Sequence, residues 1–362
     1  IVELLRAQRL KFLISTNTDG LHRRSGVPAE KISELHGNSN RVRCPKCGAV
    51  AFMDARTRHA TKAKEHDTPW TCPDPQACVD RQKAKKSSWF GKKKEPEAAP
   101  TPGGMMDTII NFGEYLEGHV AGAANDESEK ADVLLVLGTS LRVITCDALE
   151  NIAANKGKLI IVNKQITPYD SDCALRIFAN CDDVMPGLMK RLGLGIPPVT
   201  LTRHLRIRMP NDRASISVAG IDFDAAGKEV PYAFMSGATL GLFRRPAAGR
   251  PAPKAIVPLN GAGLVGPSNP KKEPWAPITL SLDGLAKALA SAPTEALAAD
   301  EKWHLCVAWM PLGHRGEPRC LVDLGAAEAV PKMPTDRTAT CTLHFADDGT
   351  PSDAGWVADT KP

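Results

Sequence analysis

The stretch ADVLLVLGTSLRVITCDALENIAANKGKLIIVN, residues 131–163, decides the fold class of this chain. It contains two apolar runs without polar alternation, Val133–Leu137 and Leu159–Val162, and the segment between them has helical character and ends at Gly157. Strands of this composition are buried on both faces, and an intervening helix makes the second strand parallel to the first. We therefore expect a strand, a helix and a strand in a parallel sheet covered by helices.

The same alternation of helix and strand flanks this unit. The first ten residues, IVELLRAQRL, place apolar side chains at helical spacing and lead into a short strand over 12–14. At the other end, DVMPGLMKRLGLGIP has the pattern of a closing helix, which we expect Pro186 to interrupt, and Pro197 and Pro198 mark the end of the domain. Helices that alternate with buried strands indicate an α/β domain.

The length of the chain, its apolar runs and its cysteine count exclude some classes of protein. At 362 residues the chain has room for two or three domains. Its apolar runs, such as Val133–Leu137, are far shorter than the roughly 20 residues that span a bilayer, and no secretory signal opens the chain. We expect neither a membrane protein nor a secreted one. Ten cysteines without a secretory signal indicate a reducing compartment, where Cys-x-x-Cys spacings favour metal over disulfides.

The positive charge of the chain is concentrated in one segment. The formal net charge is +5, but Arg81–Lys94 contains seven Lys or Arg and no acid, so removing these seven charges from +5 leaves −2. Three interpretations are open for this segment: a solvated disordered loop, a nuclear-import element, or a weak nucleic-acid contact in which Trp89 and Phe90 lie between lysine clusters.

Beyond residue 200 the sequence changes to short, partly alternating apolar segments bounded by Gly, Pro or Asp. This pattern predicts an antiparallel β region, which would serve as an interaction or targeting module or as a structural appendage. The expected strands include RHLRIRM, ASISVAGIDF, YAFMSGATLGLF, ITLSLDGL, KWHLCVAWM, RCLVDL and TATCTLHF.

A cysteine-rich insert interrupts the α/β pattern. Cys44-Pro-Lys-Cys47 is a knuckle whose Gly48 leaves room for backbone amides to point at sulfur, and a second, wider pair follows. The predicted zinc ligands are Cys44, Cys47, Cys72 and Cys78. If Cys78 lies out of reach, the candidate substitutes are His59, His66 and Asp74. A site with four protein ligands is structural, so we expect catalysis elsewhere.

Polar residues follow the predicted strands of the α/β domain. Gly138, Thr139 and Ser140 end the strand at 133–137, and Asn163 ends the next. The carboxyl edge of a parallel sheet is where nucleotides bind in open α/β folds, although a Gly-Thr-Ser sequence also suits a helix cap and Asn can bond to its own turn.

A second polar cluster follows the first strand. Asn17, Asp19 and His22 come directly after it, and His36 lies between Leu35 and Gly37. Histidine titrates near neutrality and suits general-base work, but a histidine buried in a core fits the same pattern.

Taken together, these motifs resemble the sirtuin family. STNTDGLHRRSG, ELHGN, the Cys-x-x-Cys module, DTIINFGE, ADVLLVLGTSL, LIIVN and CDDVM occur in the order of that family over residues 1–197, and several are most similar to the class IV nuclear sirtuins, particularly their nucleolar branch. The resemblance implies an NAD-dependent protein-lysine deacylase that acts on histones or other nuclear proteins, with NAD and Zn as cofactors and a nuclear, nucleolar-type location.

The resemblance also implies the fold and the domains. We expect an α/β fold: a Rossmann-like parallel sheet with an inserted small zinc-binding domain, followed by a β-rich C-terminal region. Residues 1–40 and 105–197 would form the NAD-binding domain, 41–104 the zinc-binding insert with its basic disordered loop, and 198–362 a β-rich accessory domain outside the resemblance.

The family pattern further implies a role for each site residue. His36 would be the general base that takes a proton from a ribose hydroxyl, and the products would be deacylated lysine, nicotinamide and O-acyl-ADP-ribose. The implied cofactor-binding residues are Asn17 and Asp19 at the nicotinamide, Gly138, Thr139 and Ser140 at the ribose and phosphate, Asn163 at the adenosine ribose, and Cys181 and Asp182 at the adenine. The implied substrate-binding residues are Phe112, Gly113 and Glu114, which would pair with the peptide backbone as an added strand.

Two features depart from the family pattern. Thr16 stands where sirtuins have Gln, and the glycine-rich motif that wraps the NAD pyrophosphate is expected upstream of Ile1. The alternative functions are therefore a catalytically impaired sirtuin-like scaffold and a protein mono-ADP-ribosyltransferase.

Overall fold

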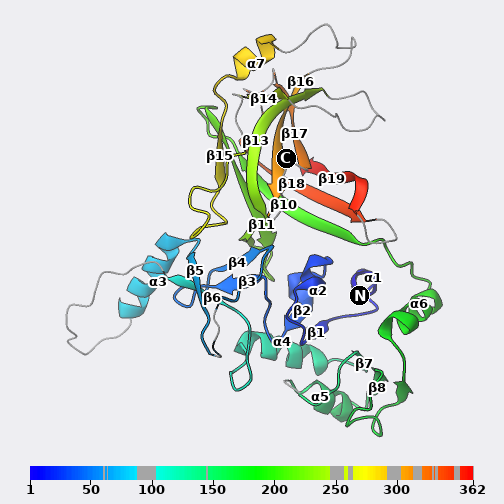
Figure 1. The fold of residues 1–362 in the computed structure, drawn as a ribbon. Helices are drawn as coiled ribbons and strands as arrows, with labels where there is room; N and C mark the ends of the chain where they lie inside the picture. The colour runs from blue at the N-terminus through cyan, green and yellow to red at the C-terminus, as the bar shows by residue number, and fades with distance from the viewer. Residues whose placement is uncertain are drawn as a thin grey trace. The chain divides into compact units, whose positions relative to one another are not determined.

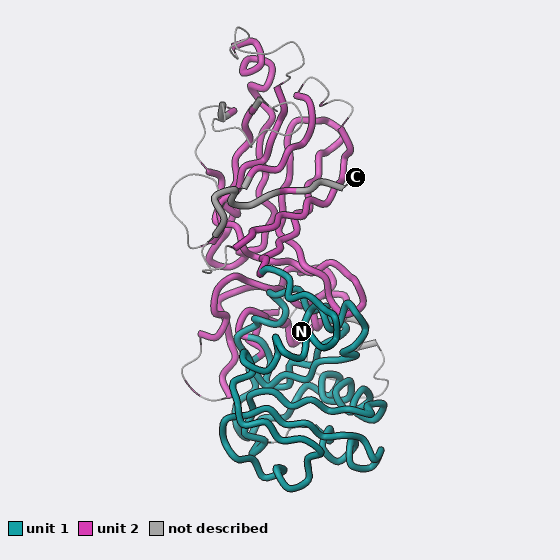
Figure 2. Tube along the Cα trace, turned by 90° about the vertical axis from the view of Figure 1, so that its right-hand side faces the viewer, with its two compact units in different colours: residues 1–38, 109–198 teal, residues 39–108, 199–362 magenta. Residues whose placement is uncertain are grey.

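The computed structural model divides into two compact units: Ile1–Asn38 with Ile109–Pro198, and Ser39–Thr108 with Val199–Pro362 (Figure 2). The described residues are 1–59, 62, 64–87, 103–143, 146–244, 257–259, 264–291, 303–312, 320–327, 330, 333–345 and 351–361. The predicted domain boundaries remain predictions, and each unit is described by itself.

The first unit contains two parallel sheets (Figure 1). Strand β1 (Leu13–Ser15) pairs with β2 (Ile32–Glu34), and β7 (Val133–Leu137), β8 (Lys158–Val162) and β9 (Leu175–Ile177) form a three-stranded sheet in that order. The predicted α/β class with a parallel sheet is confirmed, because every strand pair in the described part of this unit is parallel.

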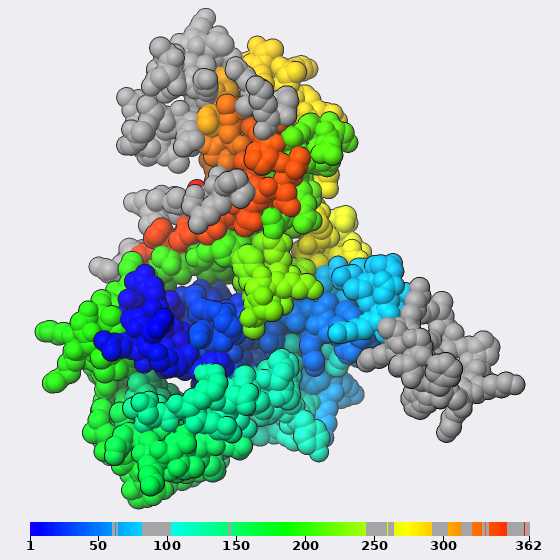
Figure 3. All heavy atoms as spheres, turned by 180° about the vertical axis from the view of Figure 1, so that it is seen from behind, coloured from blue at the N-terminus to red at the C-terminus, as the bar shows by residue number. Residues whose placement is uncertain are grey.

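Short helices precede, connect and follow these strands. They are α1 (Val2–Arg6), α2 (Leu21–Arg24), η1 (Ala29–Lys31), α4 (Gly118–Ser128), α5 (Ala148–Ala154) and α6 (Cys181–Arg191), and α1 lies at the surface (dark blue in Figure 3). Leu149 of α5 packs into one core cluster with Val136 and Leu159 of the sheet. At the turn from α5 into β8, a Cβ on Gly157 would lie 2.9 Å from the backbone oxygen of Asp132, so only glycine fits.

Two expectations for this unit were wrong. Helix α6 continues through Pro186, which is its sixth residue, so the missing amide removes one hydrogen bond near the start of the helix and leaves the rest intact. Strand β7 is not buried on both faces: Val136 is buried on the face that packs with α5, whereas Val133, on the alternate face, is 51% exposed.

The second unit is built on one long sheet. Its strands are β3 (Arg41–Arg43), β4 (Val50–Met53), β5 (Asp67–Thr71), β6 (Gly104–Asp107), β10 (Thr200–Arg208), β11 (Ser215–Phe223), β12 (Glu229–Ala233), β13 (Met235–Arg244), β14 (Val257–Pro258), β15 (Ile278–Ser281), β16 (Trp303–Pro311), β17 (Cys320–Ala326), β18 (Asp336–Phe345) and β19 (Pro351–Lys361). They follow the order β14-β13-β16-β17-β19-β18-β10-β11-β12-β4-β3-β6-β5, and β15 pairs with β11. The predicted β-rich C-terminal region is confirmed, and most of its ladders are antiparallel.

Alternating burial explains these C-terminal strands. In β10, Leu205 and Ile207 are buried, whereas the intervening Arg206 is half-buried and forms ion pairs, as expected of a strand with one face in a core. The core includes Trp309, which is fully buried and lies edge-on to Phe234 with ring centroids 5.1 Å apart. Edge-to-face aromatic pairs stabilise a core beyond the area they bury.

The described part of this unit also contains the helices α3 (Pro75–Ser87) and α7 (Leu285–Ser291). The prediction of a disordered loop from Arg81 onward is wrong for 81–87, which are helical, while 88–102 lie outside the described residues. Asp74 accepts a hydrogen bond from the amide of Ala77 at 2.8 Å and so caps the start of α3, and Lys, Arg, Gln and Ala favour its continuation. Among the described helices of the whole chain, none is long and apolar enough to cross a membrane.

Candidate functional site

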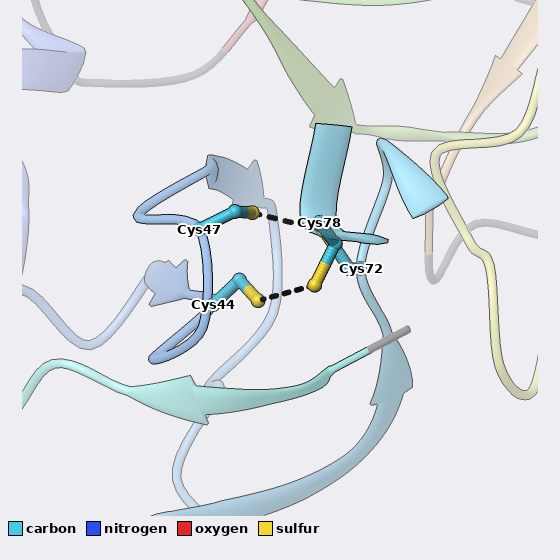
Figure 4. Close-up of side chains that lie close together, drawn as sticks. All are labelled: Cys44, Cys47, Cys72 and Cys78. Atoms are coloured by element: carbon cyan, nitrogen blue, oxygen red, sulfur yellow. Dashed lines mark hydrogen bonds between the residues drawn. The ribbon is translucent and has the colours of Figure 1, made fainter. Parts of the chain in front are cut away.

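The four cysteines of the insert converge on one point (Figure 4). Cys44 and Cys47 come from the turn between β3 and β4, Cys72 directly follows β5, and Cys78 lies in α3. Their Sγ atoms all lie within 4.8 Å of one another, with 3.7 Å between Cys44 and Cys78 and 3.5 Å between Cys47 and Cys72. Tetrahedral zinc with bonds of about 2.3 Å separates its sulfurs by about 3.8 Å, so the cluster fits zinc.

The backbone around the cluster is shaped for sulfur. The amide of Gly48 donates to the carbonyl of Cys44 at 2.8 Å with φ +79° at Gly48, and the amide of Gly103 donates to Cys78 Sγ at 3.2 Å. A Cβ on Gly103 would lie 2.7 Å from Cys44 Sγ, so a side chain at this position would occupy the space of a ligand. These contacts fit a closed structural metal site.

The charges at the cluster also suit a metal. All four cysteines are buried, and burial raises the pKa of the Cys72 thiol, which opposes thiolate formation unless a cation is bound. The guanidinium of Arg81 on α3 donates to the carbonyl of Cys47, which brings a positive charge beside a tetrathiolate zinc centre of net charge about −2. Zinc at this position would hold β3, β4, β5 and α3 together.

The three alternative ligands are engaged elsewhere. His59 packs edge-on against Trp70 with centroids 5.0 Å apart, His66 Nδ1 lies 3.1 Å from Asp107 Oδ1, and Asp74 caps α3. Because Cys78 is within reach of the other three cysteines, no substitute is needed.

In the first unit, the carboxyl ends of β1 and β2 lie at the same edge because the strands are parallel. The amide of Asn17 donates to Ser15 Oγ at 3.2 Å, and Asp19 Oδ1 accepts the amide of Leu21 at 2.9 Å as the chain enters α2. The side chains of Asn17 and Asp19 are exposed, and that of His36 is half-buried. These three predicted residues follow the paired strands at one edge, where their polar groups can meet a ligand.

The turn that carries His36 is fixed on both sides. Asn38 donates from Nδ2 to both carboxylate oxygens of Glu34, at 2.8 and 3.1 Å, and both residues are buried. Gly37 has φ +79° and donates to the carbonyl of Glu34 at 2.9 Å, and the carbonyl of His36 accepts the amide of Ile110 at 3.0 Å. Sequence reasoning missed Glu34 and Asn38, although their spacing of four residues around the histidine is visible in ELHGN.

A second group of predicted residues lies at the carboxyl ends of β7, β8 and β9. The amide of Gly138 donates to the carbonyl of Val162 at 3.0 Å, and that of Asn163 donates to Ile177 at 3.1 Å. A Cβ on Gly138 would lie only 3.6 Å from Cys181 Sγ, so Gly138 and the first residue of α6 are neighbours. The structure therefore brings Gly138, Asn163 and Cys181 to one sheet edge.

The remaining members of this group surround that edge. Thr139 Oγ1 accepts the amide of Leu141 at 3.4 Å, Ser140 is exposed, and Asp182 lies in the first turn of α6. The side-chain amide of Asn163 donates to the carbonyl of Gln165 at 2.9 Å, so it bonds to its own turn in this structure.

Arg176 organises the loop after β8, a role that sequence reasoning missed. Its guanidinium donates to the carbonyls of Asn163 at 2.9 Å and Gln165 at 2.6 Å, and to Asp170 Oδ1 at 2.8 Å. The same guanidinium lies 3.8 Å from the ring centroid of Phe178. No local motif marks this arginine, because most of its hydrogen bonds go to carbonyl groups that any sequence provides.

The predicted substrate segment forms a turn. The amide of Glu114 donates to the carbonyl of Asn111 at 3.1 Å, Gly113 has φ +82°, and Glu114 Oε2 accepts the amide of Asn111 at 2.6 Å. Phe112 is 88% exposed at the tip. The segment thus presents a large apolar side chain to solvent.

Comparison with known proteins identifies sequences similar to this chain. Residues 1–145 match the model of the Sir2 family. The chain is 34% identical over 212 residues to NAD-dependent protein deacetylase SRT1 of Oryza sativa subsp. indica, covering 58% of this chain and 38% of that protein. It is 34% identical over 208 residues to NAD-dependent protein deacetylase sirtuin-7 of Homo sapiens, covering 54% and 45%. NAD-dependent protein deacetylase 2 of Streptomyces coelicolor is 31% identical over 183 residues, covering 50% and 64%.

These matches confirm the sirtuin resemblance, although the chain spans less than half the length of the plant and human relatives. Among solved structures, Sir2Tm bound to a propionylated peptide has 22% sequence identity and a TM-score of 0.36, covering 54% of this chain and 69% of that one. A TM-score this low supports no structural inference, so the resemblance rests on sequence alone.

Proposed function

We propose that this chain, whose residues 1–145 carry a Sir2 family sequence, is part of an NAD-dependent protein-lysine deacylase. The observation that carries the proposal is the edge of β1 and β2, where exposed Asn17 and Asp19 and half-buried His36 follow two parallel strands. The relatives named NAD-dependent protein deacetylase support the same activity. The overall reaction converts acyl-lysine, NAD and one water molecule into lysine, nicotinamide and O-acyl-ADP-ribose.

The proposed chemistry assigns proton transfer to His36. NAD supplies a glycosidic bond whose cleavage releases nicotinamide, and His36 accepts the proton of a ribose hydroxyl. Asn17 and Asp19 orient the nicotinamide and its ribose by hydrogen bonds, which restricts the reacting groups to a productive geometry. The hydrogen bonds from Asn38 to Glu34 fix the turn that carries His36, which supports a defined position for its imidazole.

The proposed dinucleotide contacts lie at the edge of β7 and β8. Gly138, Thr139 and Ser140 would bind the ribose and phosphate, and Asn163 the adenosine ribose, once its amide exchanges its bond to Gln165 for the ligand. Cys181 and Asp182 at the start of α6 would lie at the adenine. The proximity of Gly138 to Cys181 supports a shared site.

The proposed substrate is an acyl-lysine segment of a histone or another nuclear protein, bound along Phe112–Glu114. We extend the proposal to a nuclear, chromatin-associated and nucleolar-type role, which the motifs that resemble class IV sirtuins imply. The basic segment Arg81–Lys94, of which 88–94 lie outside the described residues, is proposed as a weak nucleic-acid contact.

The test is nicotinamide release by the full-length protein with and without an acetylated histone peptide. We expect peptide-dependent release that His36→Ala lowers by about 10²- to 10⁴-fold, the usual contribution of a general base. His119→Ala is the matched control, because His119 lies on α4 with 72% of its side chain exposed. Unchanged release in His36→Ala would refute the base, and no release from the wild type would favour the scaffold. Transfer of labelled ADP-ribose to protein would favour the mono-ADP-ribosyltransferase.

A further inference from the structure

The zinc module, residues 39–108, and the C-terminal β region, residues 199–362, share one sheet. Strand β4 of the module pairs in parallel with β12 of the region, with Phe52 opposite Tyr232 and Met53 opposite Ala233. The ladder is extended by Asp54, whose amide donates to the carbonyl of Ala233 at 2.9 Å. Backbone hydrogen bonds therefore cross from one part to the other without a break in the sheet.

An ion pair with a buried guanidinium lies at the end of this ladder. Arg203 of β10, with 2% of its side chain exposed, donates from Nε to Asp54 Oδ2 at 2.9 Å and from Nη2 to Asp54 Oδ1 at 2.6 Å. The hydroxyl of Tyr232 donates to Asp54 Oδ1 at 2.6 Å, and Arg203 Cζ lies 4.8 Å from the Tyr232 ring. Removal of Asp54 would leave a buried guanidinium without its acid, and such a residual charge is costly.

A second set of contacts lies beside the metal ligands. Thr71, which precedes Cys72, donates from its amide to the carbonyl of Lys272 at 3.0 Å and from Oγ1 to Glu273 Oε1 at 3.1 Å. Trp275 is buried in the same core cluster as Cys72, and its ring lies 6.3 Å from that of Trp70. The β region thus contributes a side chain to the core that surrounds the sulfurs.

We propose that the C-terminal β region supports the zinc module, and that zinc binding to the module is thermodynamically coupled to the stability of the adjoining strands β10–β12. A ligand that binds only the folded form stabilises every element that folds with it. Because the module and the region share a sheet, a core and an ion pair with a buried guanidinium, zinc should stabilise strands far from it in sequence. Two independent domains on a linker would show no such effect.

The test is hydrogen–deuterium exchange of the full chain, loaded with one equivalent of zinc and then stripped by a chelator. In the wild type, we expect stripping to accelerate amide exchange about tenfold or more in β10–β12 as well as in 41–72. Acceleration confined to 41–72, with β10–β12 unchanged, would overturn the proposal. This comparison needs no variant and no enzymatic activity.

Variants then locate the coupling. Asp54→Asn removes the charge that faces Arg203, and Tyr232→Phe removes one hydroxyl; both should weaken the effect of zinc on β10–β12. Glu65→Gln is the control, because Glu65 is 50% exposed and pairs on the surface with Lys62. If zinc removal accelerates exchange in β10–β12 as much in Asp54→Asn and Tyr232→Phe as in the wild type, the ion pair does not transmit the effect. If Asp54→Asn fails to fold, the exchange data for Tyr232→Phe and the wild type still test the proposal.

Discussion

Replacing Gly103 by alanine should weaken zinc binding for a purely steric reason. The added Cβ would lie 2.7 Å from Cys44 Sγ and 3.3 Å from both Cγ and Cδ of Lys46. Non-bonded heavy atoms prefer separations of about 3.5–4.0 Å, so the sulfur contact is roughly 1 Å too short. Lys46 can move away because it is flexible, but a metal-bound sulfur cannot move without distorting the site.

The expected loss of zinc affinity in Gly103→Ala follows from the energetic cost of overpacking a site. Extra methyl groups in a packed site cost about 1–3 kcal/mol, which corresponds to roughly 5- to 160-fold weaker zinc binding if the strain falls on the metal-bound form. The measurement is zinc affinity by competition with a chromophoric chelator. Gly104→Ala is the matched control, since nothing lies within 4 Å of its Cβ and neither glycine has a positive φ. Equal affinities for Gly103→Ala and Gly104→Ala would refute the four-cysteine geometry.

Three further predictions concern other buried groups. Asn38→Asp places a second carboxylate against buried Glu34, so we expect nicotinamide release to fall about tenfold or more, and Glu34→Gln in the same chain to restore part of it by reversing donor and acceptor. Burial lowers the pKa of His204, so neutral His204 contributes stability that is fully present above the ordinary histidine pKa of about 6.5 and is lost as pH falls through the lowered pKa. Between pH 8 and pH 5, the melting temperature should therefore fall less steeply in His204→Gln than in the wild type. Burial also raises the pKa of the Cys306 thiol to about 12, so mass spectrometry should find Cys306 unmodified by iodoacetamide at pH 8 until the chain unfolds, and rapid alkylation of the folded protein would contradict its burial.

The features that the sequence predicted are those with a local signature. The spacing of Cys44-Pro-Lys-Cys47 predicts two members of the cysteine cluster, and the alternation of β10 marks its buried face at Leu205 and Ile207. Likewise, polar residues at the ends of parallel strands indicate a common edge, and the structure places Asn17 and His36 there. Local pattern and tertiary structure agree at these positions.

The features that the sequence did not predict depend on partners far apart in the chain. Asp54 and Arg203 are 149 positions apart, and each alone is an ordinary charged residue, so nothing local indicates that they form an ion pair. The pairing of β4 with β12 was missed for the same reason. Pro186 shows the opposite failure: its local signal predicts an interruption, but the remaining hydrogen bonds of α6 outweigh one missing amide.

Product analysis tests the proposed activity most directly. The full-length protein, NAD and an acetylated histone peptide would be incubated, and nicotinamide, deacetylated peptide and O-acetyl-ADP-ribose quantified by mass spectrometry. We expect the three products in equal amounts in the wild type and His119→Ala, and nearly none of them in His36→Ala. Nicotinamide release without deacetylated peptide, or equal amounts of all three products from His36→Ala and the wild type, would contradict a deacylase that uses His36 as its base.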